Sequence, residues 1–165
     1  MNIQELQKLG HEFILDALTG LSSANGDELV CGTWTLKDVI GHLATFELLR
    51  LEFVQSYWDN ALNLSTPILA MMQELGSSKF NDTQANRRKS EAYDDIIKEY
   101  VDSCNKVMEL IMQVPVKMLK QKGMFTWYYP QLDGEDFLIH SGFAHKLEHG
   151  GQINILKTRL TGNYV

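Results

Sequence analysis

Proline and long apolar runs are scarce in this sequence, and each scarcity narrows the class of protein. Only three prolines occur among 165 residues, and runs of β-branched residues are few, which favours helices over strands. No stretch approaches about 18 uninterrupted apolar residues, so we expect neither a membrane-spanning segment nor a membrane partner. The first five residues lack a basic patch followed by an apolar run, and we therefore expect no secretory signal.

Cysteine is also rare, with Cys31 and Cys104 far apart in the chain and without the close spacing of metal ligands. Two cysteines in a chain of this length are typical of free thiols in a cytoplasmic protein, although the sequence also permits one disulfide. Cys104 falls on an apolar helical stripe, where a thiol behaves as a small inert hydrophobe. Cys31 falls in a loop, with no helix N-terminus or basic neighbour that would activate it.

Positive charge is limited as well, since the net charge is −6. The one basic cluster, Arg87-Arg88-Lys89, lies among acidic residues. A nucleic-acid partner requires a concentrated positive surface, so we expect none. The length, with 44% hydrophobic and 22% charged residues, predicts one globular domain over residues 1–165 that can bury a real core.

Apolar residues recur at helical intervals in four stretches, which predicts an all-α fold built as a four-helix bundle. The expected helices cover residues 2–18, a segment that begins after residue 35, about 83 or 90 to 113, and about 134–160. Asn2, Thr35 and Asp133 are the expected N-caps, Asp38 completes a capping box, and Gly162 follows the last helix. Residues 19–32, 59–82 and 115–133 are expected to be loops or irregular, with a short apolar piece, Pro67 to Leu75, as a candidate for a helical turn or two. No strand is indicated.

The histidines differ in whether they fall on the apolar or the solvent-facing side of these expected helices. In the first helix the apolar stripe is Ile3, Leu6, Leu9, Phe13 and Ala17, and His11 falls outside it, which predicts a solvated side chain. His42 shares an apolar stripe of the second helix. His145 and His149 are one turn apart on the apolar face of the fourth helix, about 40° apart around its axis. His140 falls on the opposite side, towards solvent.

These three core-facing histidines, His42, His145 and His149, are candidate ligands of one metal ion. A single buried histidine is usually structural, with its ring bonded to a carbonyl group. Three that converge present six ring nitrogens, which a bundle core does not easily satisfy without polar partners. Three histidine ligands also leave a coordination position for water or substrate, as in catalytic zinc sites. An ion there lowers the pKa of a coordinated water or thiol and supplies a nucleophile at neutral pH.

Two further polar residues lie near the pair in the fourth helix. Gln152 is expected either to orient a ligand or to make a hydrogen bond within the bundle. Glu148 is expected at the solvated edge, with a place beside the ligands as the alternative. His145-x-x-Glu148-His149 also matches the inverted zinc-peptidase pattern, but such enzymes need a third ligand well downstream, and only 16 residues follow His149. The aromatic run Trp127-Tyr128-Tyr129, before the fourth helix, is a candidate lining of the site.

Three segments resemble the DinB-like/YfiT superfamily of bacterial four-helix bundle proteins. The run Trp34-Thr35-Leu36-Lys37-Asp38-Val39-Ile40-Gly41-His42-Leu43 is similar to the signature of its second helix. Phe80-Asn81, Arg87-Arg88 and the run to Pro115 are similar to its third-helix region. His145-x3-His149-Gly150-Gly151-Gln152-Ile153 looks like its last motif, in which Gly-Gln follows two histidines four apart. Position 150 is glycine, where many relatives have arginine.

This resemblance implies an up-down-down-up bundle, often a homodimer, with zinc or nickel held by a triad that maps onto His42, His145 and His149. Activities in the superfamily include thiol S-transfer with low-molecular-weight bacterial thiols, thiol-dependent isomerisation and hydrolysis of a genotoxin. The implied function is a metal-dependent thiol S-transferase or hydrolase acting on a small electrophilic molecule. The alternatives are a non-catalytic protein that sequesters a small toxin, and a metal site that only stabilises the bundle. Nothing in the sequence supports DNA binding.

Overall fold

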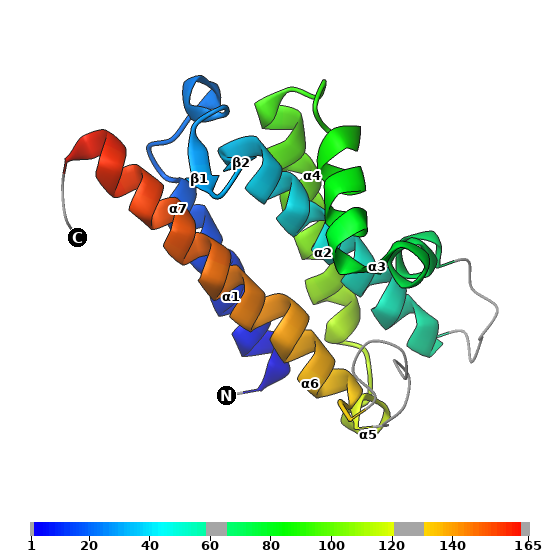
Figure 1. The fold of residues 1–165 in the computed structure, drawn as a ribbon. Coiled ribbons are helices and arrows are strands. Elements are labelled where there is room, and N and C mark those ends of the chain that lie inside the picture. Colours follow the sequence, from blue (N-terminus) through cyan, green and yellow to red (C-terminus); the bar gives the residue numbers. More distant parts are fainter. Residues whose placement is uncertain (1, 59–65, 121–130, 163–165) are drawn as a thin grey trace.

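The computed structural model describes residues 2–58, 66–120 and 131–162, and it is mostly helical, as the sequence predicts (Figure 1). The long helices are α1 (Ile3–Leu18), α2 (Leu36–Trp58), α3 (Pro67–Arg87), α4 (Tyr93–Ile111) and α7 (His145–Thr161). Shorter elements are a 3₁₀ turn (Ser23–Asn25), α5 (Val116–Leu119), α6 (Gly134–Leu138) and a π-helical segment (Ile139–Ala144). Among these described residues, no helix combines the length and the apolar character needed to cross a bilayer.

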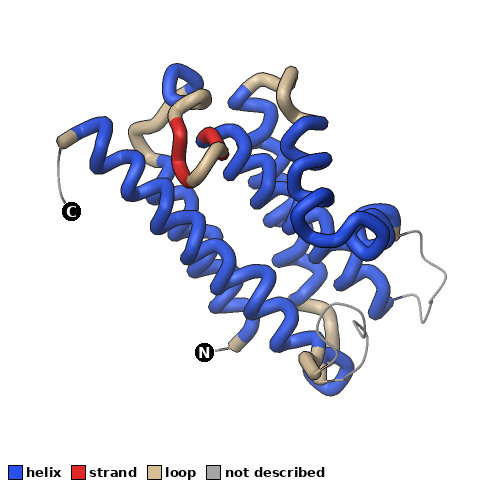
Figure 2. The backbone as a smooth tube through the Cα atoms, in the orientation of Figure 1, coloured by secondary structure: helices blue, strands red, loops and turns tan. Residues whose placement is uncertain are grey.

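One small sheet was not expected. Strands β1 (Leu29–Cys31) and β2 (Trp34–Thr35) pair antiparallel between α1 and α2 (red in Figure 2). Gly32 lies between them with φ +55°, a left-handed conformation that glycine adopts without a steric penalty. The strands are too short to give an alternating pattern, which is why the sequence alone indicates only a loop here.

The predicted N-caps are confirmed by hydrogen bonds. Asn2 Oδ1 accepts from the Glu5 backbone N–H at 2.9 Å, and Glu5 Oε2 accepts from the Asn2 N–H at 2.9 Å. The side chains of Thr35 and Asp38 exchange the same pair of bonds with each other's backbone N–H at 2.9 and 3.2 Å. Asp133 accepts from the backbone N–H three residues later. Each cap satisfies an N–H group that has no partner within its helix.

Residues 59–82 were expected to be irregular apart from a helical turn or two at Pro67 to Leu75, but in the described part α3 extends over Pro67–Arg87. The third helix expected from Thr83 or Ser90 instead begins at Tyr93, and Thr83 belongs to α3. The helix was missed because few of its residues are buried, so it has almost no apolar stripe. Its helical geometry breaks at Gly76, which has φ +71° and ψ 161°. The expected loop at 115–133 also contains α5, while residues 121–130, with Trp127, Tyr128 and Tyr129, lie outside the described residues.

The predicted apolar stripe of α1 is confirmed in part. Ile3 and Ala17 are buried, but Leu9 is 43% exposed, and Gln7 and His11 are buried as well. His11 is therefore not a solvated histidine: its Nδ1 lies 3.2 Å from the hydroxyl of Tyr100 on α4. Leu9 and His11 were misplaced because part of the interior that α1 covers is polar, and polar side chains there break the apolar periodicity.

The helices pack with α1 alongside α7 and α2 alongside α4, and α3 packs against α2 (Figure 1). The predicted fourth helix is one helical run that passes from α6 through the π-helical segment into α7. Two of its glycines allow close contacts. A Cβ atom at Gly142 would collide with the side chains of Arg50 and Gln7, and one at Gly150 would lie 2.5 Å from Phe13 Cε1. A side chain at position 150 therefore does not fit against α1.

Candidate metal centre

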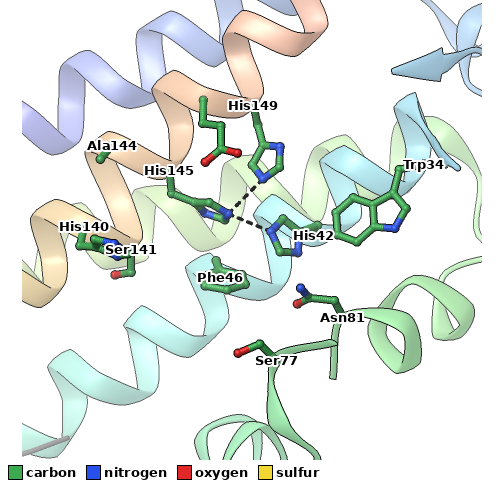
Figure 3. A pocket seen from close by; sticks show the side chains of 11 residues that line it. Trp34, His42, Phe46, Ser77, Asn81, His140, Ser141, Ala144, His145 and His149 are labelled. Atoms are coloured by element: carbon green, nitrogen blue, oxygen red, sulfur yellow. Dashed lines mark hydrogen bonds between the residues drawn. The ribbon is translucent and has the colours of Figure 1, made fainter. Parts of the chain in front are cut away.

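Three imidazole rings from two helices converge at the centre of the fold (Figure 3). His42 projects from α2, and His145 and His149 project from the first two turns of α7. Nε2 of His145 lies 2.8 Å from Nε2 of His42 and 3.0 Å from Nε2 of His149. Each of the three residues offers a ring nitrogen, and these atoms all lie within 4.8 Å of one another. The three histidines are thus close enough to hold one metal ion, as the sequence predicts.

Burial keeps these rings uncharged. It is the main cause that lowers the pKa of His42 to about 3, with the neighbouring His149 and Arg88 adding to the effect. Burial also lowers the pKa of His145 well below its usual value and lowers that of His149. Neutral imidazole carries one nitrogen lone pair, which is the form that binds a metal.

The positions of the three Nε2 atoms fit a bound cation better than a set of hydrogen bonds between the rings. A ring nitrogen has either one proton or one lone pair, so Nε2 of His145 can make a full N–H···N bond with only one of its two neighbours. Tetrahedral zinc with bonds of about 2.0–2.1 Å separates its ligand nitrogens by roughly 3.3 Å, somewhat more than the 2.8 and 3.0 Å from His145 Nε2 to its two neighbours. Neutral imidazoles are the ligands that zinc and nickel accept readily.

Gln152 holds one of the rings. Its Oε1 accepts from the Nδ1–H of His149 at 2.8 Å, which places the proton on Nδ1 and leaves the lone pair on Nε2 directed at the cluster. The sequence left open whether Gln152 orients a ligand or makes a hydrogen bond within the bundle. This one hydrogen bond does both, because it lies within the fold and orients a candidate ligand. His145 has no such partner, since its buried Nδ1 is unpaired among the described residues. Its ring is instead packed against Phe46, with ring centres 4.4 Å apart.

A cavity of about 360 Å³ opens beside the histidine cluster. Trp34 and Phe46 form aromatic walls, with Trp34 4.8 Å and Phe46 4.7 Å from the ring centre of His42. Ser77 and Asn81 of α3 contribute polar groups to the wall. The other lining residues are His140, Ser141 and Ala144 of the π-helical segment and Glu148 of α7. The open volume gives a small molecule access to the cluster.

Several of these residues were not expected at the site. Trp34 was named only in the motif of the second helix, and Ser77 and Asn81 lie in the segment whose helix was missed. Only the Phe80-Asn81 motif pointed to that region. Glu148 is exposed, as expected, and it also borders the cavity. His140 is exposed as predicted, at the same border.

A buried group of charges lies next to the cluster and was also missed. Glu47 of α2 makes ion pairs with Arg50 on the same helix and with Lys146 of α7, whose Nζ lies 2.8 Å from Glu47 Oε1. All three side chains are at most 1% exposed. Lys146 follows His145 in the sequence, so the ion pair holds α7 in register against the helix that carries His42. Nζ of Lys146 also lies 3.2 Å from the sulfur of Cys104, which is a free thiol, as is Cys31.

Comparison of the chain with family models, with curated proteins and with solved structures finds no match. The resemblance to the DinB-like/YfiT superfamily therefore rests on the sequence motifs, and membership stays a prediction.

Proposed function

We propose that this protein is a metal-dependent enzyme in which His42, His145 and His149 hold one divalent ion, zinc or nickel, beside the substrate cavity. The observation that carries the proposal is the convergence of three Nε2 atoms at the wall of a 360 Å³ cavity. A structural zinc site is usually closed by four protein ligands, whereas a three-ligand site leaves a position for a reacting molecule. The reaction class is thiol S-transfer or hydrolysis at a small electrophile.

Each part of the site has a defined task under this proposal. The ion, when bound, lowers the pKa of a coordinated water or low-molecular-weight thiol so that a nucleophile exists at neutral pH. Gln152 fixes the ring of His149 and the position of its proton. Trp34 and Phe46 shield the histidines from bulk water, which strengthens electrostatic interactions at the site.

We also propose the up-down-down-up bundle for the architecture. It is supported by the course of the chain in Figure 1, where α1 and the α6–α7 run go one way and α2 and α4 go the other. The homodimer implied by the resemblance is part of the same proposal and is testable by light scattering.

Metal analysis of protein purified without a histidine tag tests the metal site. We expect close to one equivalent of zinc or nickel, or uptake of one equivalent when either is added to metal-free protein. At a free ion concentration of about 100 times Kd, binding stabilises the fold by about 2.7 kcal/mol, which raises Tm by several degrees. His145→Ala should abolish this rise, whereas His140→Ala, which alters the cavity border outside the triad, should retain it. Less than about a tenth of an equivalent, not restored by added ion, would refute the site.

The second candidate is a binding protein that sequesters a small toxic molecule, and the aromatic walls of the cavity favour it. Turnover separates the two functions. An enzyme loses activity in His145→Ala, whereas a binding protein retains most of its ligand affinity in that variant and shows no turnover in wild type.

A further inference from the structure

The break in α3 gives the cavity a wall that is separate from the helices that carry the candidate ligands. Gly76 has φ +71° and ψ 161°, a conformation open almost only to glycine, and the helix resumes directly after it. Ser77 and Asn81, one turn apart in the resumed helix, line the cavity on this side. Figure 3 shows the polar ends of both side chains directed from α3 towards the space beside His42 and Phe46.

The polar groups that this wall presents are hydrogen-bond donors. The Oδ1 atom of Asn81 is enclosed by protein and inaccessible to solvent, so the polar atom that Asn81 presents to the cavity is its amide nitrogen. The opposite orientation of the amide would enclose two N–H groups without acceptors in place of one oxygen, which is costlier. Ser77 is exposed and adds a hydroxyl group that rotates to donate. The wall therefore suits a ligand with an acceptor such as a carbonyl oxygen, whose two lone pairs are enough for both donors.

The charge of the cavity restricts the ligand further. Among the described residues that line it, Glu148 is the one carboxylate, and there is no lysine or arginine. Recognition of a carboxylate or phosphate normally uses such cations, and the charge of Glu148 repels an anion. Trp34 and Phe46 offer flat apolar surfaces beside His42. The cavity thus combines apolar walls with hydrogen-bond donors and no fixed protein cation, which favours an uncharged ligand.

We propose that the cavity binds a small uncharged carbonyl compound with a flat apolar body, and that Ser77 and Asn81 are specificity residues that donate hydrogen bonds to its carbonyl oxygen. The inference rests on the proposed function in one respect, since it assigns a substrate class to the same site. A carbonyl compound is an electrophile. When a nucleophile adds, a bond forms to the carbonyl carbon and the electron pair of the C=O π bond moves to the oxygen, where the two donors stabilise the negative charge.

Two probes of nearly identical shape test the donors: acetophenone, which has a carbonyl oxygen, and α-methylstyrene, in which a CH₂ group replaces that oxygen. Their affinities are measured by NMR titration of the full chain in EDTA, so that neither binds through a metal ion, and the indole resonances of Trp34 report occupancy of the cavity. Because the two probes differ in hydration, the observable is the change in their affinity ratio between protein variants. Benzoate has the same ring but is anionic, and it should bind to wild type more weakly than acetophenone.

Substitutions in α3 locate the effect. Asn81→Leu keeps a similar shape but removes the donor, and it should lower the affinity ratio of acetophenone to α-methylstyrene about five-fold, the effect of one net hydrogen bond. Ser77→Ala should lower the ratio about two- to five-fold. Asn86→Leu and Ser78→Ala, at exposed positions of the same helix, are the matched controls and should leave the ratio unchanged. Asn81→Asp replaces the donor by a charged acceptor, so acetophenone should bind more weakly and the cationic probe benzylamine more tightly, opposite changes that loss of folding does not produce.

The proposal is overturned if benzoate binds as tightly as acetophenone, if Asn81→Leu leaves the affinity ratio unchanged, or if acetophenone does not bind at millimolar concentration. An unchanged ratio in Ser77→Ala alone overturns the role assigned to Ser77. Because all titrations are made without metal, their outcome is independent of the metal analysis. A failed metal analysis with the expected change in ratio would refute the proposed enzyme and leave this binding site standing. A bound ion with no change in ratio would do the opposite.

Discussion

The buried charges beside the histidines lead to an asymmetric prediction for two substitutions. Glu47 lies between two cations, Arg50 and Lys146, and none of the three side chains is more than 1% exposed. Glu47→Gln keeps the shape of the side chain but leaves both cations buried without a counter-charge. Lys146→Met removes one cation and leaves a balanced pair of Glu47 and Arg50. The two substitutions should therefore differ strongly in their effect on the free energy of unfolding.

The magnitudes follow from the cost of an unpaired buried charge. Removing one partner of a buried ion pair typically costs about 3–5 kcal/mol because the other charge is left uncompensated. Lys146→Met leaves no such charge, since Glu47 keeps Arg50 as its partner. We therefore expect Glu47→Gln to lower the free energy of unfolding by about 3–5 kcal/mol, and Lys146→Met to change it by less than about 1.5 kcal/mol. The double variant should be more stable than Glu47→Gln alone by about 1–2 kcal/mol, because one unpaired cation is gone.

Urea unfolding at neutral pH in EDTA measures these values without a contribution from bound metal. For a chain of this length the loss in Glu47→Gln corresponds to a drop in Tm on the order of 10 °C. If Lys146→Met is as damaging as Glu47→Gln, or if the double variant is no better than Glu47→Gln, the charge argument is wrong. The stability would then come from the packing of the side chains rather than from the balance of charge.

Two other predictions concern single polar contacts. Burial, followed by the charges of Lys146 and Arg50, lowers the pKa of His11 from 6.5 to about 4. The folded state then binds fewer protons than the unfolded chain at acidic pH. The contribution of neutral His11 to the free energy of unfolding is therefore fully present above pH 6.5 and is lost as the pH falls towards 4. The free energy of unfolding of wild type should fall between pH 7 and pH 5, and urea unfolding at both pH values measures this fall. In His11→Gln the fall should be smaller by up to about 2 kcal/mol, less any solvent screening. Gln152→Leu should weaken zinc or nickel binding about 10- to 100-fold, measured by competition with a chelator, because the ring of His149 loses its orienting acceptor.

Each of these has a direct check. The pH argument fails if His11→Gln loses as much stability between pH 7 and 5 as wild type does. Gln73→Leu, at an exposed position of α3, is the control for Gln152→Leu and should leave the metal affinity unchanged. Equal affinities in the two variants would show that Gln152 does not support a ligand.

Interactions within a few residues were predictable from the sequence, because the partners are fixed by helical spacing. The N-cap at Asn2 and the capping box of Thr35 and Asp38 form as expected. The face of α2 that carries His42 was equally clear, since its neighbours on that face are apolar and buried. Where the neighbouring residues are apolar, periodicity is a reliable guide.

Periodicity misled where the interior is polar or the helix is exposed. In α1 the buried positions include Gln7 and His11, so the apolar pattern was wrong to place Leu9 inside and His11 in solvent. In α3 only Met72, Phe80 and Gln84 are buried, and a helix with so few core contacts has no stripe to recognise. The ion pair of Glu47 with Lys146 was missed for the same reason, since single-sequence patterns place charged residues outside.

The sequence by itself determined the helical class of the fold, its caps and the three histidines that face inward, because these depend on spacing along one helix. Only the tertiary structure decided that the three Nε2 atoms meet, that Gln152 holds His149, and that α3 completes a cavity with Asn81 in its wall. The physical reason is that a helical period fixes the direction of a side chain around its own axis. The distance and register between two helices depend instead on contacts such as Glu47 with Lys146, which join residues far apart in the chain.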